Sequence, residues 1–198
     1  MDMQKLKDNT VHHLAPAVMY TIVSVILLGI VYPLVMTGIS ELVFPAQANG
    51  SIVYRNGVAV GSDIIGQQWT KPQYFHGRPS AAGNGYDPTS TSGTNLGPTS
   101  KKLIEATAAT IKALKKDNPS SSAPIPMDLV TSSASGIDPD ISPEAAYYQV
   151  ARVSKARGMT VDAVRALVDA HIAPRMLGFL GEPHVNVMQL NLAMDGQK

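Results

Sequence analysis

Two carboxylates separated by one residue are the first candidates for chemistry in this sequence, because Asp138 and Asp140 flank Pro139. Paired carboxylates can bind a metal ion or serve as a general acid and a general base. Acids beside a proline also form turns, and they complement the dipole of a helix that starts just after them. The pair therefore supports two interpretations: a hydrolase that uses Asp138 and Asp140, or the more common structural turn.

A nucleotide site would need a glycine-rich loop whose backbone N–H groups surround the phosphates. Gly93–Lys101 (GTNLGPTSK) resembles such a loop only loosely, because its glycine spacing differs and Pro98 has no N–H. The start of a helix at Pro98–Ser100 could still hold an anion. A capped structural helix explains the same residues, so they do not by themselves predict a nucleotide site.

Serine and histidine chemistry lacks its usual motifs. Ser135 precedes a glycine in a loop, but Gly-x-Ser-x-Gly and Lys-Thr-Gly do not occur. His76, His171 and His184 are scattered, without the i, i+4 spacing of a zinc-binding helix. The absence of cysteine excludes a thiol nucleophile and any cysteine-ligated metal. We therefore expect no catalytic residue and no metal site.

Trp69, Tyr74 and Phe75 could surround a cation, because aromatic faces attract positive charge. They lie beside His76, in a segment rich in glycine and proline. Bulky residues in such a segment more often hold a loop against the surface of a domain. We favour this role of loop anchor over a cation cage.

The segment Gln73–Ser100 has almost no aliphatic residue and no helix or strand periodicity, so it is predicted to be loop. A structureless loop of this length in a compact domain is usually functional or disordered. Tyr86 is a further bulky residue, and Arg78 and Asp87 are candidate ion-pair partners. Flexible linkers seldom carry such residues, so we expect an ordered loop.

The chain is organised around an apolar segment near its N-terminus. From Asn9 to Ser40 there is no Asp, Glu, Lys or Arg. A helix over Leu14–Met36 crosses a hydrocarbon core of about 30 Å at about 1.5 Å per residue. We expect a short tail (residues 1–13), a transmembrane anchor helix (residues 14–44) and a further domain (residues 45–198).

Two prolines and two glycines mark this segment. Pro16 would lie in the first turn, where a missing N–H costs little, and Pro33 would loosen the last turn. Gly29 and Gly38 are positions where a neighbouring helix could approach closely. We expect Gly29, Pro33 and Gly38 to pack against a partner in the membrane.

The flanking charges predict the orientation. Lys5 and Lys7 precede the segment, and the first basic residue after it is Arg55. By the positive-inside rule, a single-pass protein of the cell (inner) membrane results, with a cytoplasmic N-terminus and an extracytoplasmic domain. The alternative is a secreted binding protein cleaved near Ala46-Gln47-Ala48, but signal peptides have apolar cores of only about 7–15 residues.

The part beyond the anchor is long enough for one domain with its own core. The net charge of +1, without a basic stripe, gives no reason to expect a nucleic-acid partner. Helices are predicted over Pro98–Lys116, Ser142–Arg157 and from Thr160 onward, and strands in a hairpin around Asn56-Gly57, at Met127–Thr131 and at Val185–Met194. The predicted fold class is α+β: a single N-terminal transmembrane helix, then one soluble domain of short strands, three helices and long ordered loops.

Five long motifs of the domain closely resemble one known family. They are GSDIIGQ from Gly61, YFHGRPS from Tyr74, GTNLGPTS from Gly93, DLVTSSASGIDPDISP from Asp128, and LGFLGEP from Leu177 with the following Val185-Asn-Val. On these motifs the sequence is similar to the KdpC family, the C subunit of the Kdp potassium-transporting P-type ATPase of bacteria and archaea.

The resemblance implies a non-catalytic accessory subunit of a complex that takes up potassium at the expense of ATP. The partners that it implies are a channel-like potassium-translocating subunit, a P-type ATPase subunit and a small membrane subunit, together in the lipid bilayer. It also implies a role in assembly, and a role as a catalytic chaperone that raises the affinity of the ATPase subunit for ATP. No tightly bound cofactor is expected, and ATP is the ligand implied in complex with the ATPase subunit.

For direct contact with ATP, Gln149 is the candidate, and an ordinary glutamine on a helix surface is the alternative. A domain outside the membrane cannot reach cytoplasmic ATP, so we expect the domain to lie over the external mouth of the channel-like subunit. Loops would form the docking surface, with Trp69, Tyr74, Phe75, His76, Arg78, Asn95, Asp138 and Asp140 as the docking residues.

Overall fold

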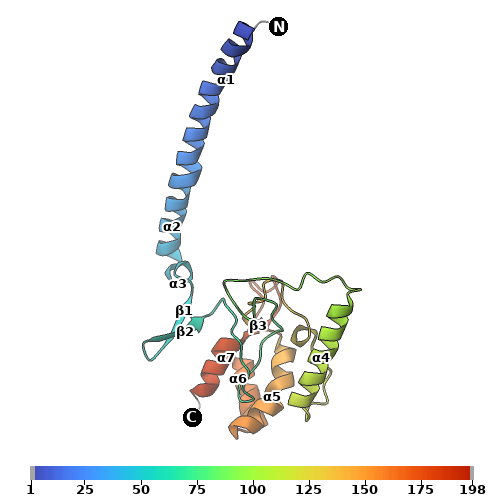
Figure 1. Cartoon of the computed structure of the whole chain (residues 1–198). Helices are drawn as coiled ribbons and strands as arrows, with labels where there is room; N and C mark the ends of the chain where they lie inside the picture. The colour runs from blue at the N-terminus through green and yellow to red at the C-terminus, as the bar shows by residue number, and fades with distance from the viewer. Residues whose placement is uncertain (1–2, 197–198) are drawn as a thin grey trace. The chain divides into compact units, whose positions relative to one another are not determined.

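The computed structural model describes residues 3–196. These residues form two compact units, with the boundary between Ser51 and Ile52 (Figure 1). The first unit is the anchor and the second is the α+β domain. This division agrees with the predicted fold class.

The anchor is helical from α1 (Met3–Ser24) through η1 (Val25–Val31) to α2 (Tyr32–Val43), followed by the short α3 (Pro45–Ala48). Residues 12–43 are long and apolar enough to span a membrane, as predicted. The helix includes most of the polar tail, and residues 1–2 of that tail lie outside the described part. Because the helix begins this early, Pro16 lies inside it, and its predicted place in the first turn is wrong.

The middle of the anchor is a π-helix, where each turn is one residue wider. The N–H of Tyr32 donates to the carbonyl of Leu27, five residues back. Pro33 follows directly and has no N–H, which explains why the helix loosens just before it. The hydroxyls of Thr21 and Thr37 donate to carbonyls four residues back at 2.8 Å, so they need no partner in a hydrocarbon environment.

Two small antiparallel sheets belong to the domain. In the predicted hairpin, β1 (Ile52–Arg55) pairs with β2 (Val58–Ser62). Asn56 and Gly57 have φ values of 52° and 77° in its turn. The other sheet has the order β3 (Asp140–Ile141), β5 (His184–Asn186), β4 (Ile172–Ala173).

The longer helices of the domain are α4 (Lys101–Asp117), α5 (Pro143–Arg157), α6 (Val161–Ala170) and α7 (Val187–Asp195). The hydroxyl of Ser142 accepts from the N–H of Ala145 and caps α5, as predicted. Thr160 caps α6 in the same way, and Gly158 ends α5 with a φ of 67°.

Two predicted strands are wrong. Met127–Leu129 forms the 3₁₀ helix η2 instead, in which the N–H of Val130 donates to the carbonyl of Met127. The segment predicted as the strand Val185–Met194 contains only β5 before α7 begins at Val187. The side chain of Asn186 accepts from the N–H of Gln189 and caps α7. The domain therefore has four longer helices within the described chain, not the three expected.

The core lies between α5, α6, α7 and the sheet of β3, β5 and β4 (Figure 1). Phe75 is wholly buried in it, although it belongs to the long loop. The other buried residues of the core are Leu129, Ile141, Ala145, Ala146, Tyr148, Val150, Val153, Val164, Val168, Val185, Val187, Leu190 and Met194. The loop therefore contributes a residue to the core, whereas its bulky residues predicted an ordered loop held against the surface of the domain.

Candidate functional site

Two buried amide side chains hold two consecutive loop residues by their backbones. Asn191 of α7 accepts from the N–H of Phe75 at 2.8 Å and donates to its carbonyl at 3.0 Å. Gln149 of α5 does the same for His76, at 2.8 and 3.0 Å. Each side chain thus pairs with a backbone as a neighbouring strand would, and together they fix the loop on the helices.

Two arginines extend this arrangement to the residues before Phe75. Arg152 of α5 donates to the carbonyls of Pro72 and Tyr74 at 2.6 and 2.9 Å. Arg157, five residues further on, donates to the carbonyl of Gln73 at 2.7 Å. Every carbonyl from Pro72 to His76 therefore accepts a hydrogen bond from a side chain of α5 or α7, and we call Pro72–His76 the clamped segment.

Gln149 has its full set of hydrogen bonds inside the protein. Its oxygen accepts from the His76 N–H and from Arg152, the latter at 2.6 Å. Its nitrogen donates to the carbonyls of His76 and Ala145. An amide side chain offers two donors and two acceptor sites, and only 1% of Gln149 is exposed. The side chain is therefore closed to a ligand in this conformation, and it is not the surface glutamine of the alternative interpretation.

A second junction joins the long loop to the segment that contains the paired acids. Arg78 donates to Asp138 at 2.9 Å, whereas Asp87 accepts from Thr89, so the predicted Arg78–Asp87 pair is wrong. The hydroxyl of Tyr86 donates to the Arg78 carbonyl at 2.6 Å. Burial, with a smaller effect of the Asp138 charge, raises the pKa of Tyr86 to about 12.

The backbones of these two segments approach closely at Gly136. A Cβ atom there would lie 2.6 Å from the carbonyl oxygen of Ser92 and 2.7 Å from the N–H nitrogen of Ala82. The φ of Gly136 is also positive, at 72°. Only glycine fits this contact without a backbone shift, so the loops form one packed layer.

The paired acids have different partners. Asp138 binds Arg78 and also accepts from the N–H of Asp140 at 3.1 Å. Asp140 lies 3.9 Å from a ring nitrogen of His184, and burial raises its pKa. Among residues 3–196, no group of three or more His, Asp or Glu side chains is placed to hold a metal ion. In this arrangement Asp138 joins its own segment to the long loop through its ion pair with Arg78.

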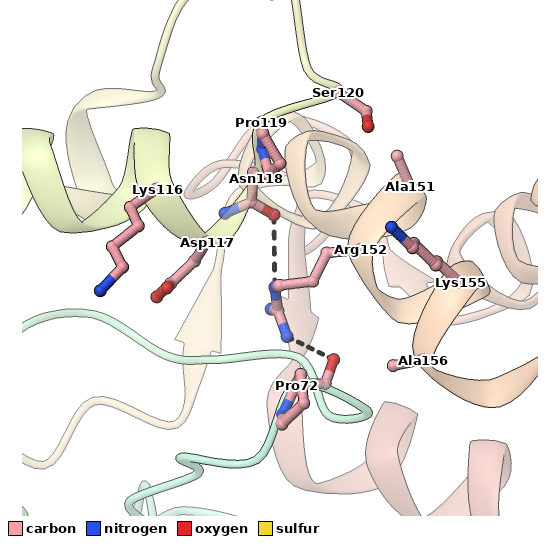
Figure 2. Close-up of a pocket in the computed structure, with 10 residues that line it drawn as sticks. All are labelled: Pro72, Lys116, Asp117, Asn118, Pro119, Ser120, Ala151, Arg152, Lys155 and Ala156. Atoms are coloured by element: carbon pink, nitrogen blue, oxygen red, sulfur yellow. Dashed lines mark hydrogen bonds between the residues drawn. The ribbon is translucent and has the colours of Figure 1, made fainter.

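A pocket of about 400 Å³ lies beside the clamped segment, between the end of α4 and α5 (Figure 2). Its lining combines apolar residues with Lys116, Asp117 and Lys155. Arg152 lies in its wall, but its guanidinium bonds to Asn118, Pro72, Tyr74 and Gln149. Burial lowers the pKa of Arg152 to about 10. Its charge is therefore used to hold the loop.

Comparison with known proteins identifies the family. The family model described as "K+-transporting ATPase, c chain" matches residues 14–196. The chain is 50% identical to the potassium-transporting ATPase KdpC subunit of Koribacter versatilis, over 93% of this chain and 94% of that one. It is 53% identical to the subunit of the same name from Allorhizobium ampelinum, over 92% and 95% of the two chains. It is also 53% identical to that of Myxococcus xanthus, over 88% and 83%.

The chain belongs to the KdpC family. The Kdp potassium ATPase is a complex to which KdpC contributes one subunit, so the chain has partner subunits. A membrane location agrees with the candidate span at residues 12–43.

The docking residues expected in this KdpC chain differ in accessibility. Trp69, His76 and Arg78 meet at a shallow pocket of about 360 Å³. Phe75 is wholly buried and presents no docking surface, whereas Asn95 is exposed. The rings of Trp69 and Tyr74 are 4.7 Å apart, and the guanidinium of Arg157 lies 5.1 Å from the Tyr74 centroid. Tyr74 thus contacts a cation of the protein itself, Arg157.

Sequence reasoning missed three residues of the clamp: Arg152, Arg157 and Asn191. A signal for Asn191 was present, because Val187, Leu190 and Met194 have the i, i+3, i+7 spacing of a helix face. Asn191 is on that face and is wholly buried. A polar residue on a buried helix face implies a hydrogen-bond partner in the core.

Proposed function

We propose that this chain is a non-catalytic accessory subunit of a high-affinity, ATP-driven potassium uptake complex, needed for its assembly, with its domain docked outside the membrane on the channel-like subunit. The observation that carries the accessory role is the match of residues 14–196 to the family model of the K+-transporting ATPase c chain. The buried amides of the clamp, Gln149 and Asn191, agree with a non-catalytic role because they bind the protein's own backbone. A catalytic or ligand-binding group must keep hydrogen-bonding capacity for its substrate. These residues have used theirs to shape a loop surface, and surface loops are where recognition usually resides.

We also propose that the chain raises the affinity of the ATPase subunit for ATP without contacting the nucleotide. Lys5 and Lys7 before the span favour a domain on the side opposite to cytoplasmic ATP. The closed hydrogen-bond set of Gln149 supports the same view. The effect would then pass through the anchor and the neighbouring subunits, and Gln149 would act by positioning the clamped segment.

Orientation is tested by labelling. The sequence has no cysteine, so a single one at Ser122, an exposed position after α4, is the only thiol of the chain. We expect an impermeant maleimide to label Ser122→Cys in intact cells. Protection until the cells are opened would overturn the proposed topology.

The effect on ATP is tested by ATP hydrolysis in membranes that contain the other subunits, with and without this chain. We expect the KM for ATP to rise at least fivefold without the chain, while residual hydrolysis by the ATPase subunit remains. An unchanged KM would overturn the chaperone role. The double variant Asp138→Asn and Asp140→Asn should retain potassium uptake, whereas uptake that is abolished in a normally folded variant would favour the hydrolase hypothesis.

A further inference from the structure

The connection between β4 and β5 carries an unusual amount of exposed apolar surface. Met176, Leu177 and Phe179 are 70%, 78% and 69% exposed, and Leu180 is 47% exposed. We call Met176–Leu180 the apolar turn. Four large apolar side chains on so short a segment form a patch, not the isolated exposed residues that are normal on a surface.

The backbone of the apolar turn is bonded to itself. The N–H groups of Met176 and Leu180 donate to each other's carbonyls, both at 2.9 Å. The N–H groups of Gly178 and Phe179 donate to the carbonyls of Arg175 and Met176, at 3.0 and 3.3 Å. These four donors need no outside partner, so burying the turn in an apolar site leaves none of them unpaired.

The turn is also held in one shape at a cost. Leu177 has a φ of 53°, a left-handed conformation that costs a non-glycine residue roughly 1–2 kcal/mol. Arg175 and Glu182 form an ion pair across the base of the turn. Local strain that the surrounding structure maintains is characteristic of functional positions, and a preformed shape reduces the entropy lost on binding.

The anchor restricts what this turn can meet. Residues 44–51 connect α2 to β1, and at roughly 3.5 Å per residue they reach no more than about 28 Å. The connection therefore keeps the start of the domain within about 28 Å of the end of α2, within reach of the other subunits of the complex. Apolar side chains can enter a bilayer in any backbone conformation. A protein pocket has a fixed shape, so a turn that already has the matching shape loses less entropy when it binds there. The strained, self-bonded shape of the turn thus favours a protein.

We propose that the apolar turn inserts into an apolar pocket on the channel-like subunit of the same complex, the subunit on which the domain is proposed above to dock. The inference rests on the accessory role proposed above, and it gives that role an attachment point outside the predicted docking residues. Leu177 and Phe179 are its central contacts, because they are exposed at the tip of the turn.

The test uses the whole complex in native membranes. A cysteine at Phe179 carries a benzophenone photo-crosslinker, and the control carries it at Met127, an isolated apolar residue that is 76% exposed. We expect an adduct with the channel-like subunit from position 179 and at least tenfold less of it from position 127. Adducts with lipid alone or only with a different subunit, or equal yields from both positions, would overturn the proposal.

A paired substitution tests whether the contact matters for assembly. Leu177→Asp should reduce recovery of the other subunits with the tagged chain at least tenfold, and Met127→Asp should leave it unchanged. Equal recovery of the two variants, each with an unfolding midpoint like that of the parent, would overturn the proposal. The KM for ATP tests the chaperone role separately. If the crosslinked complex had the same KM for ATP as membranes without this chain, that result would contradict the chaperone role but not the contact.

Discussion

The clamped segment and the apolar turn are both loops, yet they are ordered by opposite means. Side chains of α5 and α7 bond the backbone of Pro72–His76, and its Phe75 is wholly buried. Met176–Leu180 bonds to itself, and its apolar side chains are exposed. A loop can therefore be ordered by side chains of the helices on which it packs or by hydrogen bonds within its own backbone, and the hydrogen-bond partners distinguish the two cases.

The largest expected effect is on the clamped segment. Phe75→Ala should lower the free energy of unfolding by about 3–5 kcal/mol, because it removes a fully buried aromatic ring and leaves a cavity. Urea unfolding of the full chain in detergent measures the change. Tyr54→Ala is the matched control, since Tyr54 is 66% exposed, and a loss of equal size there would contradict a special role of Phe75.

Removing one half of the clamp should have the next largest effect. Asn191→Ala leaves the N–H and the carbonyl of Phe75 buried without these partners, which costs about 2–4 kcal/mol. The same unfolding measurement applies, with Gln189→Ala at an exposed position of α7 as control. A change under about 0.5 kcal/mol for Asn191→Ala would show that the amide pair does not hold the loop.

A pH dependence should distinguish the clamped segment from other parts of the domain. Burial, and then the charge of Arg152, lower the pKa of His76 in the folded protein below 6.5. Between the pKa of His76 in the unfolded chain, about 6.5, and its lower pKa in the folded protein, only the unfolded chain binds the proton. The free energy of unfolding therefore falls as the pH drops below about 6.5, by no more than about 1.4 kcal/mol per pH unit. His76→Gln should flatten the unfolding free energy between pH 7.5 and 5.

The control for that experiment is His171→Gln. The His171 ring also bonds a backbone carbonyl, that of Leu167 at 2.7 Å, but it lies outside the clamped segment. If the free energy of unfolding depended on pH in the same way in both variants, His76 would not be the cause of the pH dependence.

The smallest effect is expected at the apolar turn, with the opposite sign. Leu177→Gly relieves the left-handed strain but adds freedom to the unfolded chain, so stability should rise by less than about 1 kcal/mol. Leu180→Gly, within the turn's paired backbone, should lower stability instead. Thermal unfolding of both variants measures the difference, and a loss for Leu177→Gly would argue against strain in the turn.

The parts of the fold that sequence could predict are those with local causes. Ser142 and Thr160 cap helices through hydrogen bonds that span only three residues, and Gly158 ends α5 at a positive φ. Asn56-Gly57 likewise fixes the hairpin turn. Each of these signals is complete within a few residues of sequence.

The segment Val185–Met194 was misread because two periodicities overlap in it. The alternation of Met188, Leu190, Leu192 and Met194 favours a strand. The chain instead changes from β5 to α7 at Val187, where the Asn186 side chain caps the helix. Tertiary packing favours the helix. Because a strand was predicted instead, the position of Asn191 on the buried face of α7 was not predicted.

The candidate site was only partly predictable for a similar reason. The bulky residues of the long loop predict that it is ordered, whereas Gln149 is predicted as a contact for ATP and not as a residue that holds the loop. The role of Gln149 depends on His76, 73 residues away. The apolar turn is exposed because no other described segment of the folded domain covers it. Neither property is encoded in a local pattern.

The clamp also delays folding of the loop during synthesis of the chain. The partners Phe75 and Asn191 are 116 residues apart in the chain, and ribosomes add about 5–20 residues per second. Asn191 is therefore made roughly 6–23 s after Phe75, and the loop cannot be held by it before then. During this interval the phenylalanine is without its final partners, and the nascent domain is open to proteases and to wrong contacts.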